Sequence, residues 1–139
     1  MKQFTIHIPI EPVPKARPRF TRFGKVYTPK KTHDYEKQIA EFYTQATKGF
    51  KFEPHQALRV NLVFGMPIPK STSKRKAEYM ANGTIKHTKK TDLDNLIKAV
   101  LDGLNGVAWA DDCQIERISA MKEYAKEPYV YIYIHESVD

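Results

Sequence analysis

Two aspartates, Asp92 and Asp94, stand one residue apart directly after a pair of lysines and before an apolar repeat. At the entry of a helix such a pair can converge, because the first residue is still extended while the next has turned. Carboxylate oxygens are the hard ligands that Mg²⁺ takes, and two or three of them suffice because Mg²⁺ keeps several waters. Spacing alone favours a simpler interpretation, in which Thr91 or Asp92 caps the helix and Asp94 pairs with Lys98.

A second acidic pair, Asp111 and Asp112, follows the same helix and precedes a predicted strand. A polar turn is the common use of such residues. If that strand runs back beside the helix, its start lies near the C-terminal end of the helix and not near its mouth. Three aspartates and Lys98 would nonetheless form a minimal set for phosphodiester hydrolysis, since a bound metal can supply hydroxide and a lysine can stabilise developing charge.

The charge balance indicates a polyanionic partner. The chain has 139 residues, with 23 Lys and Arg against 16 Asp and Glu, for a net charge of +7. Nucleic acid is the commonest polyanion, although charge alone also fits an ordinary basic protein. A segment rich in basic residues and aromatics follows the predicted first strand, and two more basic runs precede Asp92. The candidate DNA contacts are Lys15, Arg17, Arg19, Arg22, Lys74, Lys76, Lys89 and Lys90.

Phe20 and Phe23 lie within the first basic segment. Aromatic side chains can stack on unpaired bases or wedge into a distorted base step, so these two are candidate wedges at a DNA distortion. Burial in the core is an equally good interpretation of the pattern.

Length and hydrophobic content predict one globular domain over residues 1–139. Cys113 is the only cysteine, which excludes a disulfide within the chain and a cysteine-based zinc site, and fits a reducing cytosol. No apolar run has the length of a membrane span, so we expect a cytoplasmic protein with no membrane partner.

Hydrophobic periodicity predicts an α+β fold, a small mixed sheet packed with helices. We expect strands at residues 4–10, 58–66, 114–122 and 129–135, an irregular loop or hairpin after the first strand, and helices at residues 34–48, 74–80 and 93–104. Both faces of the last strand are apolar, with Val130, Ile132 and Ile134 opposite three tyrosines. Either helices cover both faces, or one face meets a second subunit.

The string TKKTDLDNLIKAVLDGLNGVAWADDCQI, from Thr88 onward, resembles the signature of the RusA family of Holliday-junction resolvases. The segments PVPKARPRF and PIPKSTSKRK, which come earlier in the chain, are also similar to that family. The resemblance covers nearly the whole chain in order and implies a RusA-like fold.

The resemblance implies a Mg²⁺-dependent homodimeric endonuclease, with Mn²⁺ as a substitute, that nicks symmetric strands of a four-way DNA junction in recombination and repair. Members of the family are often carried on prophages. The essential acids of the family map onto Asp92, Asp94 and Asp112, with Asp111 in reserve, and its catalytic lysine maps onto Lys98. The competing hypotheses are a structure-specific DNA-binding protein without catalysis and a metal nuclease for flaps or single strands.

Overall fold

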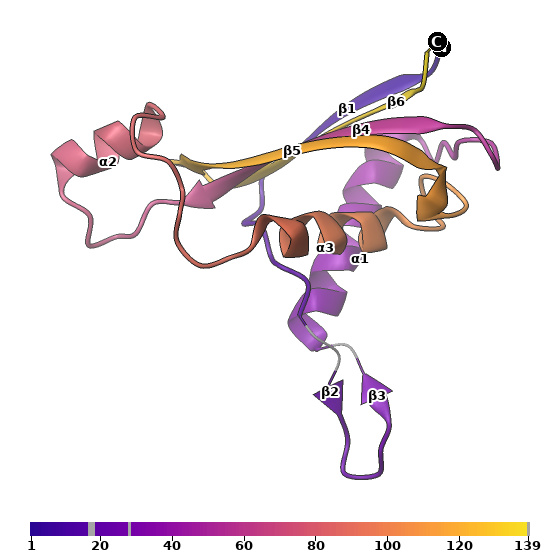
Figure 1. Ribbon diagram of the computed structural model, residues 1–139, viewed down its shortest axis with the longest axis horizontal. Coiled ribbons are helices and arrows are strands. Elements are labelled where there is room, and N and C mark those ends of the chain that lie inside the picture. Colours follow the sequence, from indigo (N-terminus) through magenta and orange to yellow (C-terminus); the bar gives the residue numbers. More distant parts are fainter. Residues whose placement is uncertain (17–18, 28, 139) are drawn as a thin grey trace.

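A four-stranded mixed sheet forms the centre of the computed structural model, which describes residues 1–16, 19–27 and 29–138 (Figure 1). Its strands lie in the order β1 (Gln3–Ile8), β6 (Tyr129–Glu136), β4 (Leu58–Pro67) and β5 (Ile115–Ala125). The strand β6 is antiparallel to both of its neighbours, whereas β4 and β5 run parallel. A parallel pair needs a long crossover connection, and here two helices fill it.

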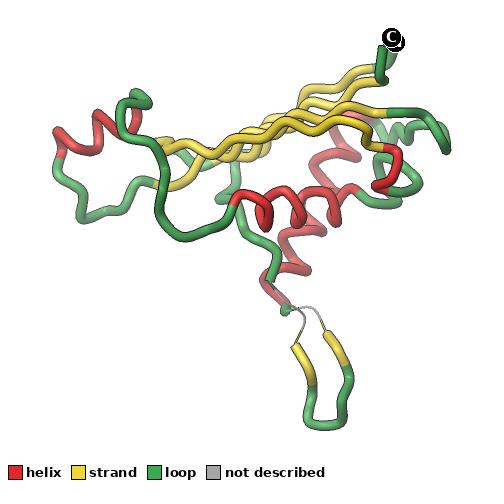
Figure 2. Tube along the Cα trace, viewed as in Figure 1, coloured by secondary structure: helices red, strands yellow, loops and turns green. Residues whose placement is uncertain are grey.

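Two helices, α1 (Lys30–Thr47) and α3 (Leu93–Leu104), pack against one face of the sheet (Figure 2). The core lies between them and the alternate residues of the strands. Val60, Leu62 and Phe64 of β4 are fully or almost fully buried, and so are Leu96 and Val100 of α3. The burial of one face of each element against the other supplies the main favourable free energy of folding.

The remaining helix, α2 (Lys74–Ala81), lies beyond one end of the sheet (Figure 1). Ser73 caps it, because the Ser73 hydroxyl accepts a hydrogen bond from the backbone N–H of Lys76 at 3.3 Å. The turn at Asn82 and Gly83 ends it, and the chain then leads to α3. None of the helices in the described ranges is long and apolar enough to cross a membrane.

The tyrosine face of β6 carries no covering element among the described residues. Helices cover the face that holds Val130, Ile132 and Ile134, whereas Tyr129, Tyr131 and Tyr133 are only half-buried. Of the two arrangements that the sequence allowed, helices on both faces are therefore not formed by this part of the chain.

The predicted fold class, an α+β domain with a small mixed sheet, is confirmed. The segment after β1 forms a short hairpin, β2 (Arg19–Phe20) and β3 (Val26–Tyr27), with Gly24 at a φ of 79° in its turn. The largest shift of a boundary is at α1, which begins at residue 30 and not at residue 34. Pro29 is the N-cap residue, with an extended ψ of 143°, and its carbonyl oxygen accepts a hydrogen bond from the backbone N–H of His33 at 3.1 Å.

The close approach of α1 and α3 depends on Gly103. A Cβ at this position would lie 3.0 Å from the Glu36 carbonyl oxygen and 3.2 Å from Cβ of Ile39. Larger side chains therefore have to push the two helices apart.

We expect Gly103→Val to lower the free energy of unfolding by about 1–3 kcal/mol, the usual cost of overpacking. Urea unfolding followed by circular dichroism measures it. Ala46→Val, at an exposed position of α1, is the matched control and should change stability by no more than about 0.5 kcal/mol. A Gly103→Val protein as stable as the control would contradict the tight contact.

Candidate active site

Asp92 occupies the N-cap position of α3, but its side chain makes no capping hydrogen bond. Its backbone is extended, with φ −69° and ψ 135°, and its side chain is exposed. Asp94 is the second residue of the helix, and its carboxylate accepts a hydrogen bond at 3.0 Å from the backbone N–H of Asn95. The positive end of the helix dipole favours both negative charges. The simple capping interpretation of Asp92 is therefore not realised.

Lys98 lies one turn further along α3 and pairs with Asp102, at 2.8 Å between ammonium and carboxylate. The side chain of Lys98 is 58% exposed. Asp102 also forms an ion pair with Lys15, with 3.0 Å between carboxylate and ammonium. The same Lys15 ammonium lies 2.5 Å from the Glu36 carboxylate of α1. The i, i+4 partner of Lys98 is thus Asp102 and not Asp94.

The pKa values of Lys15 and Asp102 record this pairing. Desolvation by burial opposes the charged form of each, but the hydrogen bonds between them, with those to Glu36 and Lys98, outweigh it. The pKa of Lys15 is consequently raised, and that of Asp102 is lowered. Both groups are therefore held in their charged forms.

Asp112 lies near the C-terminal end of α3, in the short 3₁₀ turn η1 (Asp112–Gln114) that precedes β5. Trp109, which is fully buried, donates its indole N–H to the Asp112 carboxylate at 2.7 Å. Desolvation by burial is the main cause that raises the pKa of Asp112, and the Trp109 hydrogen bond opposes it. The negative charges of Asp102 and Asp111 also raise the pKa of Asp112, and the charge of Lys98 lowers it.

The acids at the two ends of α3 are not assembled into one cluster. Within residues 1–16, 19–27 and 29–138, no group of three or more His, Cys, Asp or Glu side chains could hold a metal ion. The start of β5 lies at the C-terminal end of α3, as the sequence allowed, and Asp111 and Asp112 lie there with it. Asp111 is exposed.

Gln114 holds the turn that contains Asp111 and Asp112, a role that the sequence motifs do not predict. Its side-chain oxygen accepts the backbone N–H groups of Ala110 and Asp111, at 2.9 and 3.1 Å. Its amide N–H₂ donates to the carbonyl oxygens of Glu53 and Gln56, at 2.9 and 3.1 Å. The spacing of Asp111 and Gln114 is that of a capping box, which is a local signal for the bond to the Asp111 N–H. Nothing local indicates the other two partners, Glu53 and Gln56, which lie more than fifty residues away.

The predicted basic contacts fall in different surroundings. Arg22 and Phe23 are exposed in the hairpin that projects from the body, and Phe23 is 87% exposed, so it is not a core residue (Figure 1). Arg17 lies outside the described residues, and for Arg19 and Phe20 the backbone alone is described. Exposed lysines occur on α2 and just before Asp92, at Lys74, Lys76, Lys89 and Lys90.

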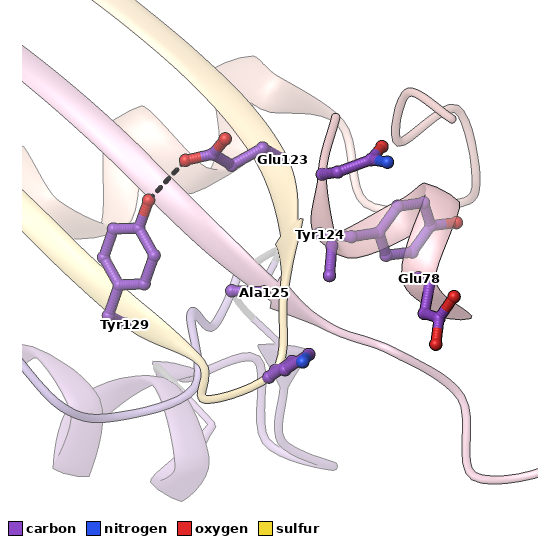
Figure 3. A pocket seen from close by; sticks show the side chains of 8 residues that line it. Glu78, Glu123, Tyr124, Ala125 and Tyr129 are labelled. Carbon is purple, nitrogen blue, oxygen red and sulfur yellow. Dashed lines mark hydrogen bonds between the residues drawn. The ribbon is translucent and has the colours of Figure 1, made fainter. Parts of the chain in front are cut away.

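A pocket of about 580 Å³ lies between α2 and the ends of β5 and β6, away from these aspartates (Figure 3). Glu78 and Glu123 both line it, and Tyr129 donates its hydroxyl hydrogen to Glu123 at 2.5 Å. Two carboxylates make it unsuited to phosphate, so the surface around the mouth of α3 remains the candidate site.

An α+β domain that displays aspartates among exposed lysines has the parts of a nuclease that acts on nucleic acid. The family model described as "Endodeoxyribonuclease RusA" matches residues 9–135. The chain therefore belongs to the RusA endodeoxyribonuclease family, which confirms the resemblance and supports a nuclease that acts on DNA in recombination and repair. The chain is also 33% identical over 129 residues to "Uncharacterized protein YqaN" of Bacillus subtilis (strain 168), an alignment that covers 91% of each chain.

The lowered pKa of Asp102 predicts a pH-dependent contribution to stability. Because the folded-state pKa lies below the ordinary value of 3.8, ionised Asp102 stabilises the fold above pH 3.8, and this contribution disappears as the pH falls through the lowered pKa. We expect Asp102→Asn to lower the free energy of unfolding by about 1 kcal/mol at pH 7, and this difference from wild type should shrink as the pH falls below 3.8.

Urea unfolding of both proteins across this pH range measures the difference. Asp34→Asn, a change at an exposed position of α1, controls for the general loss of a negative charge. A destabilisation by Asp102→Asn that is equal at every pH would show that the ion pairs are not its cause.

Proposed function

We propose that this protein is a Mg²⁺-dependent Holliday-junction resolvase that nicks two symmetry-related strands of a four-way DNA junction. Family membership supports the class of reaction. The observation that carries the assignment of the site is the Asp92 carboxylate, which stands at the N-cap position and is not used as a cap. A carboxylate in that position is free to take a ligand.

The donor chemistry fits a hard divalent cation. Asp92 and Asp94 offer carboxylate oxygens alone, with no sulfur or imidazole beside them in the motif. Mg²⁺ needs one or two carboxylates, because water and substrate phosphate oxygens fill its other positions. The resemblance to the family adds Asp112 as the third acid, with Asp111 in reserve. Both lie at the C-terminal end of α3, so Asp92 and Asp94 are the two carboxylates that the helix mouth offers together. Mn²⁺ is the expected substitute ion. When bound, the metal supplies hydroxide near neutral pH and neutralises phosphate charge.

The other residues orient and stabilise the reacting phosphate. Lys98 is exposed on the outer face of α3, where its ammonium can donate to a phosphate oxygen as negative charge develops. Asp102 accepts a hydrogen bond from the Lys98 ammonium at 2.8 Å, which fixes the direction of this side chain along the helix. Asp92 and Asp94, at the mouth of the helix, would hold the metal ion.

The basic surface binds the DNA backbone. Lys89 and Lys90 lie within three residues of Asp92, so the phosphates that they neutralise are next to the reacting one. The projecting hairpin carries the exposed Phe23 at a distance from the body, where it can stack on an unpaired base at the junction centre. A junction has two equivalent strands to cut, and a twofold homodimer matches that symmetry.

Asp92→Asn and Asp94→Asn should each reduce cleavage of a labelled four-way junction by more than about 100-fold while leaving junction binding intact, because an amide is a far weaker ligand than a carboxylate. Single-turnover cleavage with and without Mg²⁺ and a gel-shift assay in Ca²⁺ measure the two properties. Asp34→Asn is the control.

The wild-type protein should give paired symmetric nicks in the junction, with a linear duplex, a flap and a single strand as comparison substrates. Equal cutting of flaps or single strands would replace the resolvase with a less selective nuclease. Binding without cutting under every metal tried would make the protein a structure-specific binder.

Lys90→Ala should weaken junction binding with little regard to sequence, because the lysine contacts a phosphate. We expect the slope of log K against log salt concentration to fall by about 0.9, the value for one phosphate contact. Lys51→Ala removes one exposed charge just beyond α1 and should leave the slope unchanged. Equal slopes for the two variants would remove Lys90 from the DNA-binding surface.

A further inference from the structure

The residue before the aspartate pair has a strained backbone. Thr91 has a φ of 122°, in the region that side chains of L-residues rarely adopt and that a β-branched residue avoids most. Strain of this kind persists only where the surroundings hold it, and it is concentrated at functional sites. The turn immediately before Asp92 therefore needs an anchor elsewhere in the fold.

Lys122 of β5 is that anchor. Its ammonium donates hydrogen bonds to the carbonyl oxygens of Thr91, at 2.8 Å, and of Lys89, at 3.2 Å. An ammonium has three N–H donors, so one side chain can bind both carbonyls at once. These two contacts fix the peptide group that joins Lys89 to Lys90 and the one that joins Thr91 to Asp92, and with them the direction in which the chain enters α3.

A second contact two residues along the same strand supports the first. The ring of His87 packs on Tyr124, with 4.7 Å between ring centroids. Residues two apart on a strand share a face, so Lys122 and Tyr124 both point toward the segment that leads to Asp92. The segment from His87 to Thr91 is thus held along β5 at both of its ends.

We propose that Lys122 is a positioning residue, which presents Asp92 and Asp94 to the metal by holding the strained turn at Thr91 against β5. The proposal rests on the proposed function and extends it to a residue outside the signature. Lys122 acts through backbone carbonyls, and no contact of its own with metal or DNA is needed. Residues that orient a metal ligand without binding the metal themselves typically contribute about 10- to 100-fold to metal affinity or activity.

The test compares Lys122→Met, which keeps most of the aliphatic stem and removes the donors, with Lys122→Arg, whose guanidinium can donate to both carbonyls. Lys126→Met is the matched control, since it removes one exposed lysine just beyond the end of β5. Thermal unfolding first establishes that each variant folds. Hydrogen exchange without metal, calorimetric Mg²⁺ titration and the Mg²⁺ dependence of junction cleavage then follow.

Lys122→Met should exchange faster than wild type in peptides that cover residues 87–95, bind Mg²⁺ about 10- to 100-fold more weakly, and need correspondingly more Mg²⁺ for half-maximal cleavage. Lys122→Arg should restore a large part of the Mg²⁺ affinity. Junction binding without metal, and its salt dependence, should match those of wild type and of Lys126→Met.

Wild-type exchange and wild-type Mg²⁺ affinity in Lys122→Met would overturn the proposal. So would a salt slope lower by about 0.9, since that result would make Lys122 a direct phosphate contact. These results are separate from a failure of the proposed function, which would appear as wild-type protein that does not cut junctions in Mg²⁺. In that case the exchange and calorimetry data still decide whether Lys122 positions the aspartates.

Discussion

The burial of one face of α3 is the constraint on which the site depends. Leu96, Val100 and Leu104 are completely buried. Gly103 lets α1 approach so closely that a Cβ at this position would lie 3.0 Å from the Glu36 carbonyl oxygen. Once that face is fixed, the rotation of α3 about its axis is fixed as well. The polar residues of the opposite face then have one direction available, outward. The core therefore sets the direction of the side chains that we propose to be catalytic, although none of them belongs to the core.

Electrostatics explains why a protein of net charge +7 can display carboxylates at the place where it is proposed to meet DNA. The dipole of α3 and the neighbouring lysines stabilise negative charge at the mouth of the helix. Further along the helix, Asp102 is committed to Lys15 and Lys98. Asp92, by contrast, makes no capping hydrogen bond. The aspartate proposed to bind metal and the aspartate that forms ion pairs therefore differ in the bonds that they already make, and not in their spacing.

The periodic elements could be predicted from the sequence because local pattern decides them. The apolar repeat correctly predicted α3, and the alternation of apolar and polar residues correctly predicted β4 and β6. The roles of Gln114 and Lys122 could not be predicted, since their partners lie far along the chain and backbone carbonyls leave no trace in side-chain patterns. The prediction that Lys98 pairs with Asp94 was wrong for a different reason. Asp94 and Asp102 both stand four residues from Lys98, so spacing alone does not choose between them, and in the structure Asp102 is the partner.

The order of strands in the sheet has a consequence for how the chain is made. The strand β1 pairs with β6, and Phe4 lies opposite Ile134. During synthesis, the hydrogen-bonding groups of β1 therefore stay unpaired with their partner strand until β6 has left the ribosome. The sheet cannot close before β6 has been made, and contacts between such distant residues slow the search for the native state. A chain that stops before β6 would keep an open strand edge, which is a template for aggregation.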